Sequence, residues 1–156
     1  MGTTEPVKEL ELEKRLIAKI RNFILELGKG FSFIANQHRL EYNSKEYFVD
    51  MLFFHRGLRC LIAIELKIGS FKAEYVGKMN LYLSLLDKLE KGENENQSIG
   101  IILCADKDHL DVEIALQDIN KPIGVAEYQL LLPKDELQVL LVSEIKASEE
   151  TNDNEE

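Results

Sequence analysis

Apolar residues change from a helical to a strand-like spacing near residue 30. Over residues 8–28 they recur every three or four positions and the segment ends at Gly28, which predicts a helix. The apolar segments that follow are short, rich in aromatic and aliphatic residues, and divided by turn residues at 43–44 and 55–57. This pattern predicts an antiparallel meander of three strands over residues 31–42, 45–54 and 58–67.

Helical and strand-like segments alternate after residue 70. A helical pattern over residues 72–92 precedes a continuous apolar segment at 98–105, which is typical of a strand covered on both faces. A further helix, strand and helix are expected over residues 108–119, 124–132 and 135–145. Strands joined through helices form parallel pairs, so the order α-β-β-β-α-β-α-β predicts an α/β domain with a mixed central sheet flanked by helices.

Three charged residues interrupt the apolar pattern of the second and third strands. Asp50 lies in the second strand, and Glu65 and Lys67 lie in the third. Alternate residues of a strand share one face. If the three-residue link at 55–57 closes the hairpin, Asp50 lies roughly opposite Ala63. Glu65 is then its diagonal neighbour, about 7 Å away, whereas a slip of one residue would place the charges on opposite faces.

The first two predicted helices each turn a polar side chain towards their apolar face. Glu13 lies at the centre of the apolar face of the first helix. A carboxylate there is costly unless it is paired or bound to a cation. On the second helix, apolar side chains surround Tyr82, and Lys78 lies close to it. The residues around Glu13 are Leu10, Leu16, Ile17, Ile20, Ile24 and Leu27, and those around Tyr82 are Tyr75, Met79, Leu85, Leu86 and Leu89.

The inward charges are acidic groups with one lysine beside them. Carboxylates that converge from different elements can share a hard divalent cation such as Mg²⁺ and would repel one another strongly without it. A lysine beside such a site can orient or deprotonate a water molecule and neutralise charge that develops on a phosphate. Together these groups indicate phosphodiester hydrolysis, although an E-x-K triplet alone occurs by chance in many proteins of this size.

These residues resemble the signature of the PD-(D/E)XK nuclease superfamily, which has an acidic residue on one strand and (D/E)-x-K on the next. Val49-Asp50 stands at the P-D position, with valine in place of proline, and Glu65-Leu66-Lys67 stands at the second. The resemblance is more specific to YhcG-type nuclease domains (similar to the C-terminal part of DUF1016 proteins), and it covers roughly residues 10–133. Segments similar to theirs include FILELGKGFSFIANQHRLE, YFVDMLFFHRGLRCLIAIELK and FKAEYVGKMNLYLSLLD.

The resemblance implies a fold and a role for each matching residue. The fold would be a restriction-endonuclease-like core, α-β-β-β-α-β. Asp50 and Glu65 would be ligands of Mg²⁺ or Mn²⁺, with the Leu66 carbonyl as a third ligand and Lys67 as the catalytic lysine. Glu13 would be the helical acid that several members of the superfamily add. Lys78 and Tyr82 stand where RecB-like members have a glutamine and a tyrosine, so the lysine departs from that pattern.

The resemblance also implies a substrate and partners. DNA would be the substrate, in repair, recombination or restriction-type defence. Family members commonly carry an additional helical, DNA-binding domain ahead of this one, and the sequence leaves a homodimer open. The alternative is a catalytically silent DNA-binding or assembly module of the same fold.

Charge distribution changes the picture that the overall composition gives. The formal net charge of −9 over 156 residues is unfavourable for binding nucleic acid. Residues 1–92 nevertheless carry 15 Lys and Arg against 12 Asp and Glu, whereas residues 93–156 carry 4 against 16. One nuclease-like domain is expected over residues 1–145, followed by a disordered acidic tail over 146–156.

Some positively charged positions are candidates for contact with the nucleic-acid backbone. Lys72 and Lys78 lie just after the third strand, and His55 and Arg56 lie in a turn. A solvated helix end explains the two lysines equally well, and an ordinary exposed turn explains the other pair better.

The sequence does not favour several other classes of protein. No window approaches the roughly 20 apolar residues of a membrane span, and the start does not match a signal peptide, so a cytoplasmic protein is expected. Cys60 and Cys104 lie in apolar segments without CxxC spacing and are predicted to be buried free thiols. The three histidines are too dispersed for a zinc motif, and Gly69 and Gly77 form no phosphate-binding loop.

Overall fold

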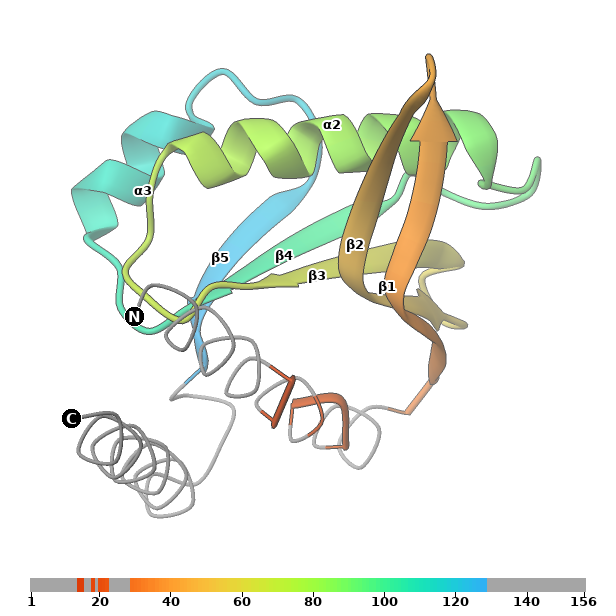
Figure 1. Ribbon diagram of the computed structural model, residues 1–156, viewed down its shortest axis with the longest axis horizontal. Helices are drawn as coiled ribbons and strands as arrows, with labels where there is room; N and C mark the ends of the chain where they lie inside the picture. Colours follow the sequence, from red (N-terminus) through yellow and green to blue (C-terminus); the bar gives the residue numbers. More distant parts are fainter. Residues whose placement is uncertain (1–13, 16–17, 19, 23–28, 129–156) are drawn as a thin grey trace, which may run out of the picture.

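The sheet has five strands that lie side by side in the order of the sequence. The computed structural model describes residues 14–15, 18, 20–22 and 29–128 (Figure 1). The first three strands pair antiparallel, and the last two add in parallel, which confirms the predicted mixed sheet. The strands are β1 (Phe31–Tyr42), β2 (Lys45–His55), β3 (Cys60–Leu66), β4 (Ile99–Cys104) and β5 (Ile123–Glu127).

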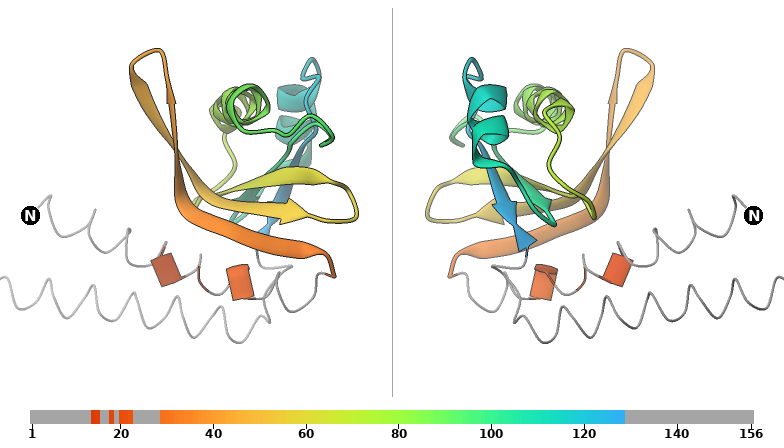
Figure 2. Two further views of the ribbon diagram at one scale, coloured as in Figure 1. Left: turned by 90° about the vertical axis from the view of Figure 1, so that its right-hand side faces the viewer. Right: turned by 90° about the vertical axis from the view of Figure 1, so that its left-hand side faces the viewer.

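Helices cover both faces of the sheet. α2 (Glu74–Leu89) and α3 (His109–Leu116) connect the parallel strands and lie on one face (Figure 2). The described residues of the first predicted helix are helical and lie on the opposite face, where Ile20 is fully buried. Among the described residues, no helix is long and apolar enough to cross a membrane.

Four predictions concern residues that lie outside the described ranges. They are the position of Glu13, the end of the last strand at 129–132, the helix over 135–145 and the acidic tail over 146–156. The proposed domain boundary near residue 145 therefore stays a prediction.

The core consists of two apolar layers, one on each face of the sheet. All seven residues of β3 are buried, because this strand lies at the centre of the sheet and is covered on both sides. Under α2, Met79 and Leu83 pack directly over Gly100 of β4. A Cβ atom on Gly100 would lie 2.6 Å from Met79 Cγ, so the helix can approach this closely only over glycine. Cys60 and Cys104 are buried free thiols, as predicted.

The β1–β2 hairpin bends away from the rest of the sheet and rises beside α2 (Figure 2). Its turn consists of Asn43 and Ser44, whose φ angles of 55° and 63° are those of a type I′ turn. His38 Nε2 lies 2.7 Å from Glu90 Oε1, just beyond the end of α2. The outer part of the hairpin therefore contacts the end of α2, and β2 pairs with β3 only from Met51 onwards.

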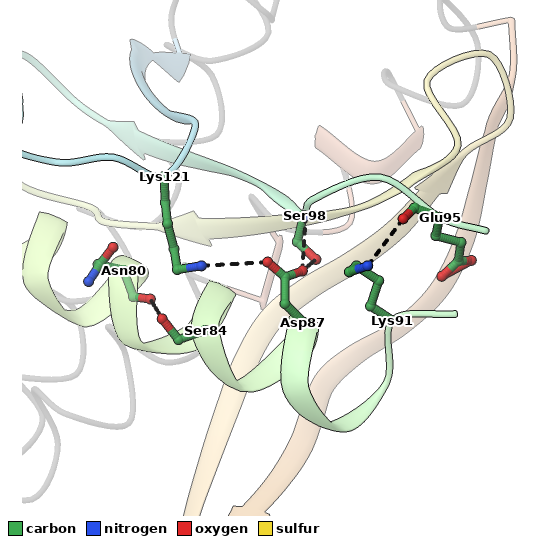
Figure 3. Close-up of polar contacts among 7 residues, drawn as sticks. All are labelled: Asn80, Ser84, Asp87, Lys91, Glu95, Ser98 and Lys121. Carbon is green, nitrogen blue, oxygen red and sulfur yellow. Dashed lines mark hydrogen bonds and ion pairs between the residues drawn. The ribbon is translucent and has the colours of Figure 1, made fainter. Parts of the chain in front are cut away.

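Asp87 joins the last turns of α2 to the beginning of β4 (Figure 3). Its Oδ1 accepts hydrogen bonds from the Ser98 N–H at 3.0 Å and the Ser98 hydroxyl at 2.5 Å. Its Oδ2 lies 3.6 Å from Lys121 Nζ. Ser98 is fully buried, so these bonds satisfy polar groups that cannot reach water.

Candidate active site

Asp50 and Glu65 meet where β2 and β3 separate. The antiparallel pairing ends with Met51 opposite Ile64, so Asp50 and Glu65 are the next residues on the two strands. The register places them opposite each other rather than on a diagonal.

The predicted register of this hairpin was wrong by two residues. Ala63 pairs with Leu52, not with Asp50. The link between the strands has four residues, 56–59, and Arg59 adopts a left-handed φ of 50°. A shift of two residues keeps each side chain on its face, so the expected approach of Asp50 to the third strand is retained.

Where β2 and β3 separate, the carboxylates of Asp50 and Glu65 accept hydrogen bonds from backbone N–H groups. The Asp50 N–H donates to Glu65 Oε1 at 3.0 Å, and the Leu66 N–H donates to Asp50 Oδ2 at 2.9 Å. A continued β-ladder would supply carbonyl oxygens at these points. The exposed fractions of Asp50 and Glu65 are only 8% and 5%. Two acidic side chains are thus fixed next to each other with little access to solvent.

The environment of Glu65 opposes its ionisation. Burial, followed by the negative charge of Asp50, raises the pKa of Glu65 to about 8. The hydrogen bond from the Asp50 N–H and the positive charges of Lys67 and Lys78 act in the opposite direction without overcoming these effects. A positive charge beside the two carboxylates would favour ionisation of both.

Lys67 and side chains of α2 lie near this acidic pair, because the charges of Lys67 and Lys78 act on Glu65 and those of Glu65 and Asp50 act on Tyr82. Lys67 Nζ lies 4.8 Å from the centroid of the Tyr75 ring, and Lys78 Nζ lies 5.6 Å from that of Tyr82. Tyr82 is buried, as predicted, and its pKa is raised by burial and by the charges of Glu65 and Asp50. Lys78 is exposed, and its positive charge still acts on Glu65.

The other residues predicted to contact nucleic acid do not contact the acidic pair directly. His55 is five residues from Asp50 along β2, which corresponds to about 17 Å. Its Nδ1 accepts a hydrogen bond from the Leu58 N–H at 3.0 Å, so the ring stabilises the hairpin turn that also contains Arg56. Lys72 is exposed in the segment between β3 and α2.

Comparison with known protein families identifies the domain. The family model of the YhcG PDDEXK nuclease domain matches residues 1–145. The chain belongs to this family. A curated relative of the YhcG PDDEXK domain, "Putative nuclease YhcG" of Escherichia coli (strain K12), is 38% identical over 127 residues. The match covers 81% of this chain and 34% of the relative, so the chain spans about a third of that protein's length.

Two solved structures share the fold of this YhcG PDDEXK domain. A repair endonuclease from Pyrococcus abyssi has a TM-score of 0.50 and 17% identity, over 70% of this chain and 45% of its own. A protein of unknown function has a TM-score of 0.54 and 14% identity, over 85% of this chain and 66% of its own. Identities this low show the fold alone, which is the predicted restriction-endonuclease-like core.

The oxygen donors of this YhcG PDDEXK domain suit a hard divalent cation, and PDDEXK nucleases generally use divalent metals. Mg²⁺ is commonly bound through one or two carboxylates, with water and phosphate oxygens in the other positions. Asp50 and Glu65 supply two such groups, and the Leu66 carbonyl lies on the same side of its strand as the N–H that contacts Asp50. Within the described residues no third His, Cys, Asp or Glu joins them. The predicted further acid, Glu13, lies outside those residues.

Gln37 is a residue of the YhcG PDDEXK site that was not predicted from the sequence. Its Nε2 donates a hydrogen bond to Asp50 Oδ1 at 3.1 Å. One signal for this contact was present in the sequence. A two-residue turn at 43–44 pairs residue 42 with residue 45, and this register brings Gln37 opposite Asp50.

Proposed function

We propose that this domain hydrolyses phosphodiester bonds in DNA, with Mg²⁺ or Mn²⁺ held by Asp50 and Glu65. The supporting observation is the pair of buried carboxylates at the separated ends of β2 and β3, with Lys67 one residue beyond β3. The E-x-K signature of the family falls on these residues.

In this proposal the acidic residues bind the cation. Asp50 and Glu65 provide carboxylate oxygens, the Leu66 carbonyl provides a third ligand, and Glu13 adds a further acid from the first helix. A bound divalent cation would lower the pKa of a coordinated water molecule and neutralise charge on the scissile phosphate. Its charge would also favour the ionised form of Glu65, whose pKa is otherwise raised by burial and by Asp50.

The lysines act on the substrate in this proposal. Lys67 orients the attacking water and stabilises the negative charge that develops on the phosphate. Lys78, whose ammonium group lies over the Tyr82 ring, contacts a neighbouring phosphate together with Lys72. His55 and Arg56 contact the nucleic-acid backbone at a more distant point, because His55 lies about 17 Å along β2 from Asp50 and Arg56 follows it in the link to β3.

We further propose a cytoplasmic role in DNA repair, recombination or restriction-type defence. A helical DNA-binding domain outside this chain and a second copy of the chain are the proposed partners. The curated relative is about three times as long as the segment that this chain matches, which leaves space there for a domain of that kind.

The proposal is tested by nicking of supercoiled plasmid in Mg²⁺, Mn²⁺ or EDTA. Wild type should nick the plasmid with either metal and not in EDTA. Asp50→Ala and Lys67→Ala should each lower the rate at least about 100-fold. Lys91→Ala, which changes a half-buried lysine that donates to the Glu95 carbonyl in the loop after α2, should not lower it. Protein concentrations should reach the range of non-specific DNA affinity, about 10⁻⁶ to 10⁻⁴ M. Nicking that does not depend on metal would contradict the proposed mechanism. Binding of DNA without nicking would contradict the proposed enzymatic activity and support the catalytically silent module.

A further inference from the structure

Gln37 has an unusual backbone conformation for a residue inside a strand. Four described residues other than glycine have a positive φ: Gln37, Asn43, Ser44 and Arg59. Asn43 and Ser44 form the β1–β2 turn, and Arg59 ends the link before β3. Gln37, with a φ of 47°, lies in the middle of β1. Left-handed conformations of this kind are unfavourable for residues with a side chain and occur preferentially at functional sites.

The conformation of Gln37 coincides with a direct contact to the acidic pair. Asn36 pairs with Met51 and His38 pairs with Val49, so Gln37 lies opposite Asp50. Its side-chain amide donates to Asp50 Oδ1 at 3.1 Å, while the Leu66 N–H donates to Oδ2 at 2.9 Å. The carboxylate is thus held from both neighbouring strands, and rotation of the carboxyl group would break both hydrogen bonds.

A neutral donor is well suited to orient a carboxylate that binds a cation. Each carboxylate oxygen can accept more than one interaction, so an oxygen bonded to Gln37 still has a lone pair for a metal. A lysine or arginine in the same place would repel the metal, and an apolar residue would leave the Asp50 carboxylate with only the hydrogen bond from the Leu66 N–H to orient it. Groups that hydrogen-bond to a ligand in this way typically change metal affinity 10- to 100-fold when they are removed.

We propose that Gln37 is a positioning residue, which holds the Asp50 carboxylate in the orientation that binds the metal. This inference rests on the proposed role of Asp50 as a metal ligand. Gln37 acts through Asp50 and has no contact with the substrate in this proposal.

The test compares two substitutions that make the same backbone change. Gln37→Gly removes the amide and tolerates the left-handed conformation, because glycine has no Cβ. Ser44→Gly is the matched control, since it replaces another residue of positive φ in the turn of the same hairpin, away from Asp50. Mn²⁺ affinity is measured by calorimetry, thermal unfolding is measured in EDTA, and plasmid nicking is measured as a function of Mn²⁺ concentration.

Gln37→Gly should bind Mn²⁺ about 10- to 100-fold more weakly than wild type, and Ser44→Gly should bind it with wild-type affinity. Both variants should unfold in EDTA within a few degrees of wild type. At saturating Mn²⁺, the nicking rate of Gln37→Gly should return to within about threefold of wild type, because mass action restores the bound state.

Different outcomes separate this inference from the proposed function. If wild type binds Mn²⁺ through Glu65, as shown by loss of binding in Glu65→Ala, and Gln37→Gly keeps wild-type affinity, only the role of Gln37 is overturned. A large fall in the unfolding temperature of Gln37→Gly in EDTA would also overturn it, because the residue would then be structural. If wild type itself binds no Mn²⁺, the proposed function fails and the role of Gln37 fails with it.

Discussion

Replacing Glu65 with glutamine should stabilise the domain at alkaline pH when no divalent cation is present. Burial and the charge of Asp50 raise the pKa of Glu65 from 4.5 to about 8. Between these two values the folded state keeps a proton that the unfolded state releases. The free energy of unfolding of wild type therefore decreases as the pH rises from 4.5 to about 8, and this carboxyl adds no pH dependence outside that window.

The size of the effect follows from the difference between the two pKa values. At about 1.4 kcal/mol per pKa unit, the loss of unfolding free energy caused by ionising Glu65 reaches up to about 5 kcal/mol above pH 8. This loss vanishes below pH 4.5. Its upper value is comparable with the whole stability of a small domain, about 5–15 kcal/mol. In Glu65→Gln, the amide oxygen can still accept the hydrogen bond from the Asp50 N–H, but it carries no charge.

The assay is urea denaturation followed by circular dichroism in EDTA, from about pH 5 to about pH 9. The stability advantage of Glu65→Gln over wild type should grow with pH across this range. Glu46→Gln is the matched control on the same hairpin, because Arg39 lowers the pKa of Glu46 and its removal should give no gain at high pH. Mn²⁺ at 100 times its dissociation constant should restore about 2.7 kcal/mol to wild type at pH 8 and not to Glu65→Gln. A difference between wild type and Glu65→Gln that stays below about 1 kcal/mol at every pH would refute the reasoning.

Three further predictions concern single positions. Lys67→Ala should keep Mn²⁺ affinity within about threefold of wild type in calorimetry, because an ammonium group is not a ligand, and a loss comparable with that of Glu65→Ala would assign Lys67 to metal binding instead. Gly100→Ala should lower the free energy of unfolding, measured in urea, by about 1–3 kcal/mol, since its methyl group would lie 2.6 Å from Met79 Cγ. The control Gly124→Ala, with open space around it, should change this free energy by less than about 0.5 kcal/mol. Equal values for the two variants would contradict the close packing of α2 on β4. Asp87→Ala should lower the free energy of unfolding by about 2–4 kcal/mol because it leaves the buried N–H and hydroxyl of Ser98 unpaired. The control Ser84→Ala, which removes one hydrogen bond to the Asn80 carbonyl, should lower it by less than about 1 kcal/mol. An equally small loss in Asp87→Ala would show that the contacts of Asp87 in Figure 3 contribute little to stability.

The fold was predictable because apolar spacing and turn residues agree along most of the chain. The continuous apolar segment at 98–105 predicted a strand covered on both faces, and β4 (Ile99–Cys104) is that strand. The second helix is shorter than expected, and its predicted inward residue Leu89 is 43% exposed because it is the last residue of α2. Helix ends depend on contacts that an apolar pattern does not contain.

The registers of the β1–β2 and β2–β3 hairpins show which strand pairings the residue types can predict and which they cannot. Asn43 and Ser44 are residue types that favour a two-residue turn, so the β1–β2 register from the turn to Ala35 followed from the sequence, whereas the shift between Phe33 and Ala35 did not. Arginine is not a residue type that signals a left-handed φ, so the link at 56–59 was predicted at 55–57 and Asp50 was placed two residues from its true partner. The contact between Gln37 and Asp50 also depends on a left-handed residue, which alternation along a strand cannot indicate.

Asp50 and Glu65 are proposed to hold a divalent cation together at the separated ends of β2 and β3. Anomalous diffraction from crystals of the domain grown with Mn²⁺ would locate this cation. We expect an anomalous peak between the two carboxylates, about 2.1 Å from an oxygen of each, and no peak there in crystals of Glu65→Ala. A map from wild-type crystals without a peak at this position, or with Mn²⁺ bound only elsewhere, would contradict it.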